Sequence, residues 1–374
     1  MNATMNVVFT GGGTAGHVSP MLAMADALQR RYDDTEVEPN IFNILMIGTA
    51  EGMEATLIPD AGYDFATVAK VPMPRKPSRD LLSVPFRLRK AVKQARRLLK
   101  EHETQVVVGV GGYAATPVYL AARAEKIPVI VHEGNVRPGL ANKLAARFAT
   151  VVACAFEGTD LPGVIHVGMP MRTAITELPV GPTMKAQARE SLGLAVDKTT
   201  LVVTGGSSGA LNLNNAVGGA LDHLLETGAQ VFHLTGRDKT VTDDTGSPIE
   251  QAGYVQVEYV DGLARIYQAA DLIVARAGAG TVHEIAAIGL PSVLVPLPIG
   301  NGEQELNAAG LKESGAAVVV KDHDFTSQWV ATRLPELLVD QPRLEYMAQT
   351  AKNLGINDAA ETMATIISET KVAR

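Results

Sequence analysis

The sequence has little cysteine and no long apolar run. Cys154 is the one cysteine among 374 residues, which excludes a disulfide framework and fits a reducing compartment. No uncharged apolar run reaches the roughly 18–20 residues that a membrane-spanning helix needs, and the first residues lack the basic and apolar regions of a signal peptide. We therefore expect a cytoplasmic protein that is soluble or that binds a membrane surface.

A glycine-rich stretch near the N-terminus, TGGGTAGHVSP, lacks the residues that would complete either of two phosphate-binding motifs. Gly11, Gly13 and Gly16 spell G-x-G-x-x-G, and Gly11 and Gly16 also frame a P-loop. His17 and Val18, however, stand where a P-loop has its lysine and its serine or threonine. The acidic residue of a dinucleotide-binding motif matches poorly: Asp33, Asp34 and Glu36 have about the right spacing but precede the second apolar run, and Glu51 follows it late. The stretch therefore fits neither motif.

Acidic residues are nearly absent from residues 70–100, although the whole chain has a formal net charge of −7. This segment has eleven Lys and Arg residues against Asp80 alone, and the rest of the chain has a net charge of −17. Apolar residues lie among the basic ones, as in segments that bind a membrane interface: Leu81, Leu82, Val84, Phe86 and Leu88. The alternatives are a solvated helix face and a nucleic-acid patch. Because aromatic interleaving and an RNA-binding motif are missing, we expect no nucleic-acid partner.

Short apolar runs alternate with glycine turns and helical patterns. The order of strand, glycine turn and helix at 6–32 occurs again at 199–217, and the continuous Val- and Ile-rich runs are typical of buried parallel strands. The sequence thus predicts two doubly wound α/β domains, residues 1–172 and 173–356. In such sheets ligands bind outside the carboxyl ends of the strands.

Two further segments complete the predicted organisation. Residues 160–200 are rich in Pro and Gly and are the expected interdomain linker. Residues 357–374 have a helical pattern, and we expect this last helix to pack back on the first domain.

Glycine turns follow apolar runs at three places, 11–16, 205–210 and 276–284. In each, glycine lets the backbone approach a ligand closely, and the next helix begins with unpaired N–H groups that favour anions. A single turn of this kind is as well explained by tight packing between strand and helix. Three of them in one chain favour a phosphate or sugar ligand.

The motifs GGTAGHVSP, GVGGYAATP, HEGNVRPGLANK, GMPMR, VVTGGSSGALNLN, RAGAGTVHEIAAIGLPSVLVP and NGEQELNA occur in the order and spacing of the MurG family of peptidoglycan glycosyltransferases. The resemblance covers residues 6–370. It implies a GT-B fold, in which two Rossmann-like domains face each other across a cleft. It also implies inverting transfer of N-acetylglucosamine from UDP-GlcNAc to the C4 hydroxyl of lipid I, without a metal or another cofactor.

The resemblance assigns roles to residues of the first domain. Thr14, Ala15 and Gly16 resemble a diphosphate-contacting turn. His17 is either the base that takes a proton from the acceptor hydroxyl or a ligand of the lipid pyrophosphate. Glu133 is the rival base, although it and His132 are equally well explained as residues that cap the next turn. Tyr113 and Asn135 are expected to contact substrate.

Residues around the second domain resemble a UDP-GlcNAc site. Arg172 would offset the charge that grows on departing UDP, Ser207 would contact the diphosphate, and Val260 would lie near uracil. Glu284 would accept hydrogen bonds from the ribose, although a carboxylate in the first turn of a helix also stabilises the helix dipole without a ligand. Five residues would contact the nucleotide through their backbone: Ala279, Gly280, Thr281, Val282 and His283. Gln304 would contact the donor sugar.

The sequence DHD at 322–324 matches the D-x-D pattern of metal-dependent glycosyltransferases, but no other hard-cation ligands surround it in the sequence. We therefore expect a solvated turn and no metal.

The expected location is the cytoplasmic face of the cell membrane, which residues 70–100 would contact through its anionic lipids. The resemblance also allows other cell-wall synthesis proteins as partners. Two rival functions remain, a UDP-GlcNAc 2-epimerase of the same fold and a non-catalytic subunit that binds a nucleotide sugar.

Overall fold

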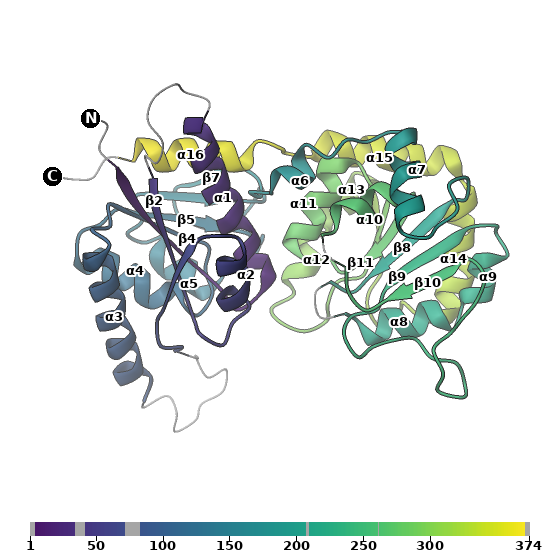
Figure 1. Cartoon of the computed structure of the whole chain (residues 1–374), viewed down its shortest axis with the longest axis horizontal. Coiled ribbons are helices and arrows are strands. Elements are labelled where there is room, and N and C mark those ends of the chain that lie inside the picture. Colours follow the sequence, from purple (N-terminus) through teal and green to yellow (C-terminus); the bar gives the residue numbers. More distant parts are fainter. Residues whose placement is uncertain (1–3, 34–41, 72–82, 207–208, 261, 371–374) are drawn as a thin grey trace. The chain divides into compact units, whose positions relative to one another are not determined.

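The computed structural model describes residues 4–33, 42–71, 83–206, 209–260 and 262–370 (Figure 1). The chain forms two compact units. It passes from unit 1 to unit 2 between Arg172 and Thr173, and it returns to unit 1 between Ile356 and Asn357. Each unit has one parallel sheet with helices on both faces, so the predicted fold class of two doubly wound α/β domains is confirmed.

Unit 1 is built on a seven-stranded parallel sheet with the strand order β3-β2-β1-β4-β5-β6-β7. Its elements are β1 (Met5–Thr10), α1 (Ala15–Asp33), β2 (Phe42–Gly48), α2 (Glu54–Asp60), β3 (Asp64–Thr67), α3 (Val84–Glu101), β4 (Val106–Gly109), α4 (Ala115–Ala124), β5 (Val129–Glu133), α5 (Leu140–Ala145), β6 (Val151–Cys154), β7 (Val164–His166) and α16 (Ala359–Glu369).

Unit 2 is built on a six-stranded parallel sheet with the order β10-β9-β8-β11-β12-β13. Its elements are α6 (Thr173–Thr176), α7 (Pro182–Ser191), β8 (Thr200–Thr204), α8 (Leu211–Gly218), α9 (Leu221–Leu225), β9 (Gln230–Leu234), β10 (Tyr254–Val257), α10 (Ala264–Ala269), β11 (Leu272–Ala275), α11 (Ala279–Ile288), β12 (Ser292–Leu294), α12 (Glu303–Asn307), α13 (Ala309–Glu313), β13 (Ala317–Val319), α14 (Ser327–Val339) and α15 (Gln341–Leu354).

The glycine turns lie at the point in each sheet where the order of strand addition reverses. From β1 the chain crosses to β2 on one side, and β4 then adds on the other side; β8, β9 and β11 repeat this arrangement in unit 2. The first glycine turn follows β1, the second follows β8 and the third follows β11. Ligands of doubly wound sheets bind at this switch point.

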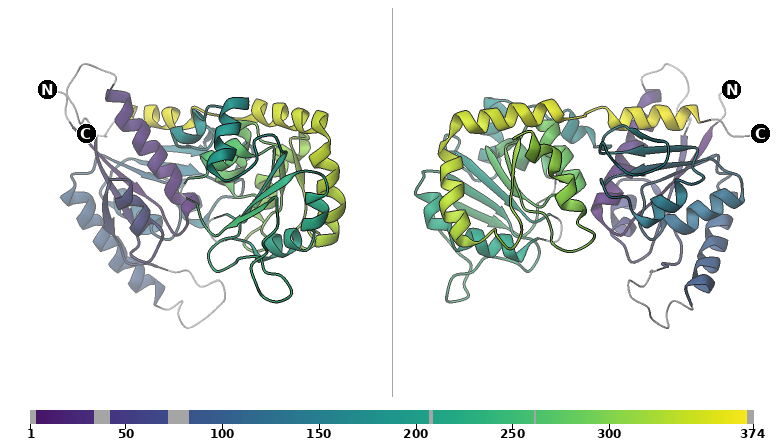
Figure 2. Two further views of the ribbon diagram at one scale, coloured as in Figure 1. Left: turned by 45° about the vertical axis from the view of Figure 1, so that its right-hand side comes forward. Right: turned by 180° about the vertical axis from the view of Figure 1, so that it is seen from behind.

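The core of unit 1 includes the last helix of the chain. Met363, Ala364 and Ile367 of α16 are buried in one cluster with Leu22 and Ala25 of α1. Figures 1 and 2 show α16 (yellow) beside α1 (purple) in every view. Arg30 and Glu361 add an ion pair of 2.8 Å across the two helices. The apolar face of α1 is therefore completed by residues that come more than 300 positions later.

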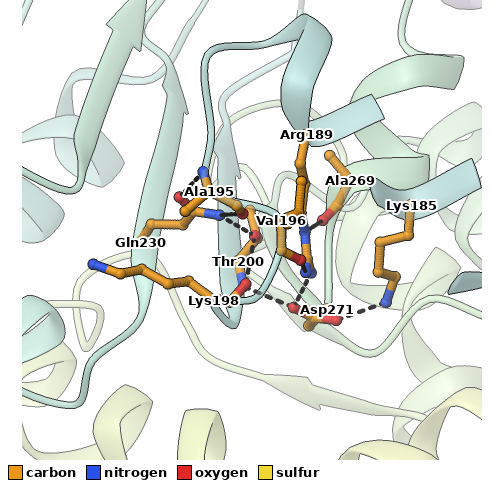
Figure 3. A network of polar contacts seen from close by, with 9 residues as sticks. All are labelled: Lys185, Arg189, Ala195, Val196, Lys198, Thr200, Gln230, Ala269 and Asp271. Carbon is orange, nitrogen blue, oxygen red and sulfur yellow. Dashed lines mark hydrogen bonds and ion pairs between the residues drawn. The ribbon is translucent and has the colours of Figure 1, made fainter. Parts of the chain in front are cut away.

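The predicted linker at 160–200 is wrong for most of its length. It contains β7, α6 and α7, and the change of unit falls at one point within it. A partly buried polar network fastens α7 to the sheet (Figure 3). Asp271 accepts hydrogen bonds from Lys185 Nζ at 2.6 Å, and its other oxygen accepts from Arg189 Nη2 at 2.5 Å and from Thr200 N at 2.7 Å. Pro and Gly end short elements here and do not mark a free connection.

Candidate active site

The first glycine turn is packed on one side and open on the other. A Cβ atom on Gly11 would overlap Val110, and one on Gly12 would overlap the carboxylate of Glu54. At Gly13, whose φ is +95°, a Cβ would meet nothing within 4 Å, and at Gly16 it would meet only Thr14 Oγ1 at 3.7 Å. The first two glycines therefore serve packing, while the latter two leave the N-terminal end of α1 accessible to a ligand.

Glu54, which was not among the predicted site residues, fixes this turn through a hydrogen bond to its backbone. It is fully buried at the start of α2, and its carboxylate accepts hydrogen bonds from Gly13 N at 2.8 Å, Thr49 N at 3.0 Å and Thr49 Oγ1 at 2.8 Å. Burial alone would raise the pKa of Glu54, but the hydrogen bonds from Gly13, its own N–H and Thr49 outweigh burial and leave the pKa lowered. The turn thus rests on an ionised carboxylate.

His17 lies in the first turn of α1 with a half-buried ring. Its Nδ1 is 3.1 Å from Thr14 Oγ1, so Nε2 is the ring nitrogen left for a substrate. Burial lowers the pKa of His17 below 6.5, and the negative charges of Glu133 and Glu54 oppose this without reversing it. The imidazole is therefore neutral near pH 7, the form that can accept a proton.

Glu133, the rival base, has its carboxylate committed to the chain. It is 3% exposed, and it accepts hydrogen bonds from Asn135 N at 3.0 Å, Gly139 N at 3.0 Å and Asn142 Nδ2 at 2.9 Å. The first two bonds close the turn after β5, and the third fixes α5. This geometry favours the alternative in which Glu133 caps the turn.

The other candidates of unit 1 differ in their surroundings. Tyr113 is exposed and Asn135 is half-buried beside Glu133. Arg172 Nε lies 3.7 Å from Asp26 Oδ2 on α1, and Asp26 also accepts a 2.7 Å hydrogen bond from the Tyr63 hydroxyl. This hydrogen bond and burial raise the pKa of Tyr63, burial being the larger cause. Arg172 is thus held at α1 with most of its side chain exposed.

Of the two glycine turns in unit 2, the one after β8 repeats the division into packed and open positions, and the one after β11 has no packed glycine. A Cβ on Gly205 would overlap Ala210, and one on Gly209 would overlap the carbonyl oxygen of Thr235. At Gly206, with φ of +78°, and at Gly280 it would meet nothing within 4 Å. Ser207 lies outside the described residues.

The third turn leads into α11, whose N-terminal residues are the predicted backbone contacts, Ala279, Gly280, Thr281, Val282 and His283. Glu284 is the sixth residue of α11 and stands in its second turn, so its predicted place in the first turn is wrong. The helix begins earlier than expected because Gly278 takes the N-cap position in an extended conformation. His283 Nδ1 is 2.8 Å from the carbonyl oxygen of Ala279 and lies along its own helix.

Glu284 is paired with a residue that the sequence reasoning missed. Its Oε2 accepts a 2.6 Å hydrogen bond from the hydroxyl of Tyr267 on α10. Burial raises the pKa of Glu284, and the bond from Tyr267 opposes this. One carboxylate oxygen is thus fixed by the protein.

Gln304 and Val260 lie outside the three turns. Gln304 Oε1 accepts a 2.9 Å hydrogen bond from Leu297 N, which leaves its Nε2 group for a further acceptor. Val260 follows β10, is half-buried and comes directly after the exposed Tyr259.

The DHD turn is only partly solvated, which corrects the prediction. His323 and Asp324 are exposed, but Asp322 forms a 2.5 Å ion pair with Arg276 directly after β11. This pairing of residues 46 positions apart could not be predicted, because an ion pair across two loops has no local sequence pattern. Within the described ranges no group of three or more His, Cys, Asp or Glu side chains could hold a metal.

The basic segment 70–100 is described at 70–71 and 83–100, and Leu81 and Leu82 lie outside the described residues. Val84 is buried and Leu88 packs beside it, so these two apolar residues belong to the core and not to an exposed surface. Phe86 is 78% exposed. In the part of the chain that the structure describes, no helix is long and apolar enough to cross a membrane.

The chain matches two family models, the glycosyltransferase family 28 N-terminal domain at residues 7–154 and the glycosyltransferase family 28 C-terminal domain at residues 200–363. A curated protein of Paenarthrobacter aurescens (strain TC1) is 52% identical over 98% of this chain and 96% of its own length; one of a Nocardioides species is 46% identical over 98% of both. Both are named UDP-N-acetylglucosamine--N-acetylmuramyl-(pentapeptide) pyrophosphoryl-undecaprenol N-acetylglucosamine transferase.

Solved structures agree in fold. The crystal structure of Acinetobacter baumannii MurG has a TM-score of 0.77 at 30% identity and covers 98% of this chain and 100% of that one. A putative UDP-N-acetylglucosamine 2-epimerase from Listeria monocytogenes has a TM-score of 0.65 at 13% identity over 98% of this chain and 96% of that one, a likeness of fold alone.

Proposed function

This chain belongs to glycosyltransferase family 28, and we propose that it transfers N-acetylglucosamine from UDP-GlcNAc to the C4 hydroxyl of undecaprenyl-pyrophosphoryl-N-acetylmuramyl-pentapeptide (lipid I), which gives lipid II. The observation that carries this proposal is the full-length likeness to the curated Paenarthrobacter transferase of that name. The epimerase shares the fold at low identity only, so no specific observation favours the epimerase reaction here.

Unit 2 would hold the donor. The open side of Gly280 and the N–H groups that begin α11 suit a diphosphate, since helix N-termini attract anions. The carboxylate of Glu284, fixed through one oxygen by Tyr267, can accept hydrogen bonds from ribose hydroxyls with the other. Val260 would contact uracil, and the free amide group of Gln304 would bind the donor sugar.

Unit 1 would supply the base. His17 is neutral; with its proton on Nδ1, where it would be donated to Thr14 Oγ1, Nε2 would take the proton of the acceptor C4 hydroxyl. As that proton moves to Nε2, the hydroxyl oxygen bonds to C1 of GlcNAc and the bond from C1 to the phosphate oxygen breaks. The bonding electrons leave with UDP, and the configuration at C1 inverts. Arg172 and the glycine-turn N–H groups would stabilise the departing charge. Glu133 would position the turn and not react.

The exposed face of α3 would bind the anionic cytoplasmic surface of the membrane. Arg96 and Lys100 pair with Glu125, and Arg97 pairs with Glu101. Four exposed basic residues form no ion pair with another described residue: Arg87, Arg89, Lys90 and Lys93. Each can contribute about 1 kcal/mol near an anionic leaflet, and the exposed ring of Phe86 can enter the interface.

The test is UDP release from UDP-GlcNAc by the purified chain, with and without a lipid I analogue. Release that depends on the analogue, together with a disaccharide product, is the expected result. Conversion of UDP-GlcNAc at C2 without UDP release would replace the proposal with the epimerase reaction. Binding of UDP-GlcNAc without either reaction would indicate a non-catalytic nucleotide-sugar subunit.

A further inference from the structure

Arg276 and Asp322 form an ion pair at the carboxyl edge of the sheet of unit 2. Arg276 directly follows β11, and Asp322 begins the turn after β13. Arg276 Nη1 lies 2.5 Å from Asp322 Oδ1, and the two side chains are 11% and 18% exposed. Removing two charges from water is unfavourable unless they compensate each other. Neither residue contributes to the hydrophobic core, so the pair needs an explanation other than packing.

The contacts of the pair reach the loops that follow four adjacent strands. Arg276 Nη1 also donates hydrogen bonds to the carbonyl oxygens of Val295, at 3.1 Å, and Pro296, at 3.4 Å, directly after β12. The backbone carbonyl of Asp322 accepts a 2.6 Å hydrogen bond from Asn212 Nδ2 near the start of α8. In the sheet order, β8, β11, β12 and β13 are consecutive. The pair, together with the backbone of Asp322, therefore links the segments that follow all four strands.

Three of these four segments lie next to residues that are predicted to contact UDP-GlcNAc, the sugar donor. α8 follows the second glycine turn, the loop after β11 is the third glycine turn with Gly278 and Gly280, and the loop after β12 is bonded to Gln304 through Leu297. The third turn has little packing of its own on its open side, because a Cβ at Gly280 would meet no atom within 4 Å. Its position thus depends on the residues where it leaves β11, the half-buried Arg276 and the buried Ala277.

We propose that the Arg276–Asp322 ion pair positions the donor nucleotide: it holds the third glycine turn in register with the start of α8 and the loop before Gln304, so that the backbone N–H groups of α11 meet the diphosphate of UDP. The inference rests on the proposed function in that it places UDP at this turn. Arg276 and Asp322 act through the loops and are positioning residues. The DHD turn, which resembles a metal motif, thereby acquires a role that needs no metal.

The test compares Asp322→Asn with Asp324→Asn by calorimetric titration of each purified full-length variant with UDP. Asp322→Asn keeps the side-chain shape and the carbonyl that binds Asn212, but it removes the charge that faces Arg276. We expect its Kd for UDP to rise about tenfold, which corresponds to about 1.4 kcal/mol. Asp324 stands in the same turn and is 59% exposed, so Asp324→Asn should stay within about twofold of the parent. Asp322→Glu, which restores the charge, should recover most of the affinity.

A purely structural role would give a different pattern. Asp322→Asn would then melt at a lower temperature but bind UDP as tightly as the parent at 10 °C, where both are folded, and this result would overturn the inference. Hydrogen exchange supplies a second readout, because a loosened turn should exchange faster at residues 276–284 in Asp322→Asn than in Asp324→Asn. Equal exchange in the two variants would also contradict the proposal.

Asn212→Ala provides a variant that leaves no charge buried without its partner. Asn212 is exposed, and its loss removes only the link between α8 and the turn of Asp322. We expect UDP to bind about threefold more weakly; unchanged affinity together with unchanged exchange at 276–284 would overturn the inference. A parent chain that does not bind UDP at all would refute the proposed donor site and the inference with it. A parent that binds UDP while all variants match it would refute the inference alone.

Discussion

The carboxylate of Glu54 accepts a 2.8 Å hydrogen bond from the backbone N–H of Gly13, so the first residue of α2 fixes the glycine turn that begins α1. The open positions of that turn are therefore held by a buried charge and not by the glycines themselves.

Glu54→Gln should lower the free energy of unfolding by about 1–3 kcal/mol, because one of the donors Gly13 N, Thr49 N and Thr49 Oγ1 would lose its acceptor in a buried site. Urea unfolding measures this change. The matched control is Glu51→Gln, at an exposed position three residues earlier, which should change the stability by less than about 0.5 kcal/mol.

The same pair predicts a pH dependence. The pKa of Glu54 is lower in the folded chain than in the unfolded chain, where it is near 4.3. Its ionised form therefore stabilises the fold above that pH, and this contribution is lost as the pH falls through the folded pKa. Below about pH 4 the parent should lose stability more steeply than Glu54→Gln. Parallel pH profiles of the two proteins would contradict the assignment.

His17→Ala should lower kcat by about 10²–10⁴-fold while the Kd for UDP stays unchanged, because a general base acts in the chemical step. The parent should lose kcat as the pH falls through the pKa of His17, which burial places below 6.5, since the protonated ring cannot accept a proton. Glu133→Gln should mainly lower the melting temperature through its turn contacts. The opposite pattern, with kcat lost in Glu133→Gln alone, would make Glu133 the base.

Glu284→Gln should weaken UDP binding by about tenfold at pH 7.5, since a carboxylate accepts ribose hydroxyl hydrogen bonds more strongly than an amide. The pKa of Glu284 is raised by burial, so in the parent the affinity for UDP should fall as the pH decreases through that raised pKa. Calorimetry at several pH values measures both effects. If the variant kept the pH dependence of the parent, another group would be responsible.

Tyr267→Phe isolates the hydrogen bond that orients this carboxylate. It should weaken UDP binding by a smaller factor of about 3–5, because a typical hydrogen bond contributes about 1 kcal/mol. Unchanged affinity in Tyr267→Phe would show that the carboxylate is held by its own helix alone.

Replacing the four unpaired basic residues of α3, Arg87, Arg89, Lys90 and Lys93, with alanine should weaken binding to phosphatidylglycerol vesicles by up to about 4 kcal/mol. Vesicle flotation at low and high salt measures this loss. The matched control replaces four basic residues of unit 2 with alanine: Lys198, Lys312, Arg333 and Arg343. This control has the same change of net charge and should float like the parent. Equal losses in both variants would mean that net charge, and not α3, determines the binding.

The sequence predicted the buried strands better than three of the four edge strands. β1, β4, β5, β8 and β11 have continuous apolar runs because neighbours cover them on both sides and both faces. β3, β7 and β10 were not predicted, and each stands at an edge of its sheet. Edge strands are short and partly exposed here, with burial on fewer sides, so their residues need not form an apolar run.

In the candidate site, sequence reasoning predicted the residues that belong to a local pattern. The glycine turns and the start of each following helix are of this kind. Glu54, Tyr267 and Asp322 were missed or misinterpreted because each acts across a distance in the chain, 41 residues from Gly13 in the first case and 17 from Glu284 in the second. Such contacts are created by the fold and leave no spacing to detect.

The packing of α16 against α1 has a consequence for synthesis on the ribosome. The 184 residues from Thr173 to Ile356 are made between the two parts of unit 1. At a translation rate of about 5–20 residues per second, these residues alone take about 10–40 s to make, so α1 waits at least that long for its partner helix. During that interval the apolar surface that Met363, Ala364 and Ile367 later cover is open to chaperones and to other nascent chains. Unit 2 can complete its own sheet in the meantime, so the unit that starts first is the last to finish folding.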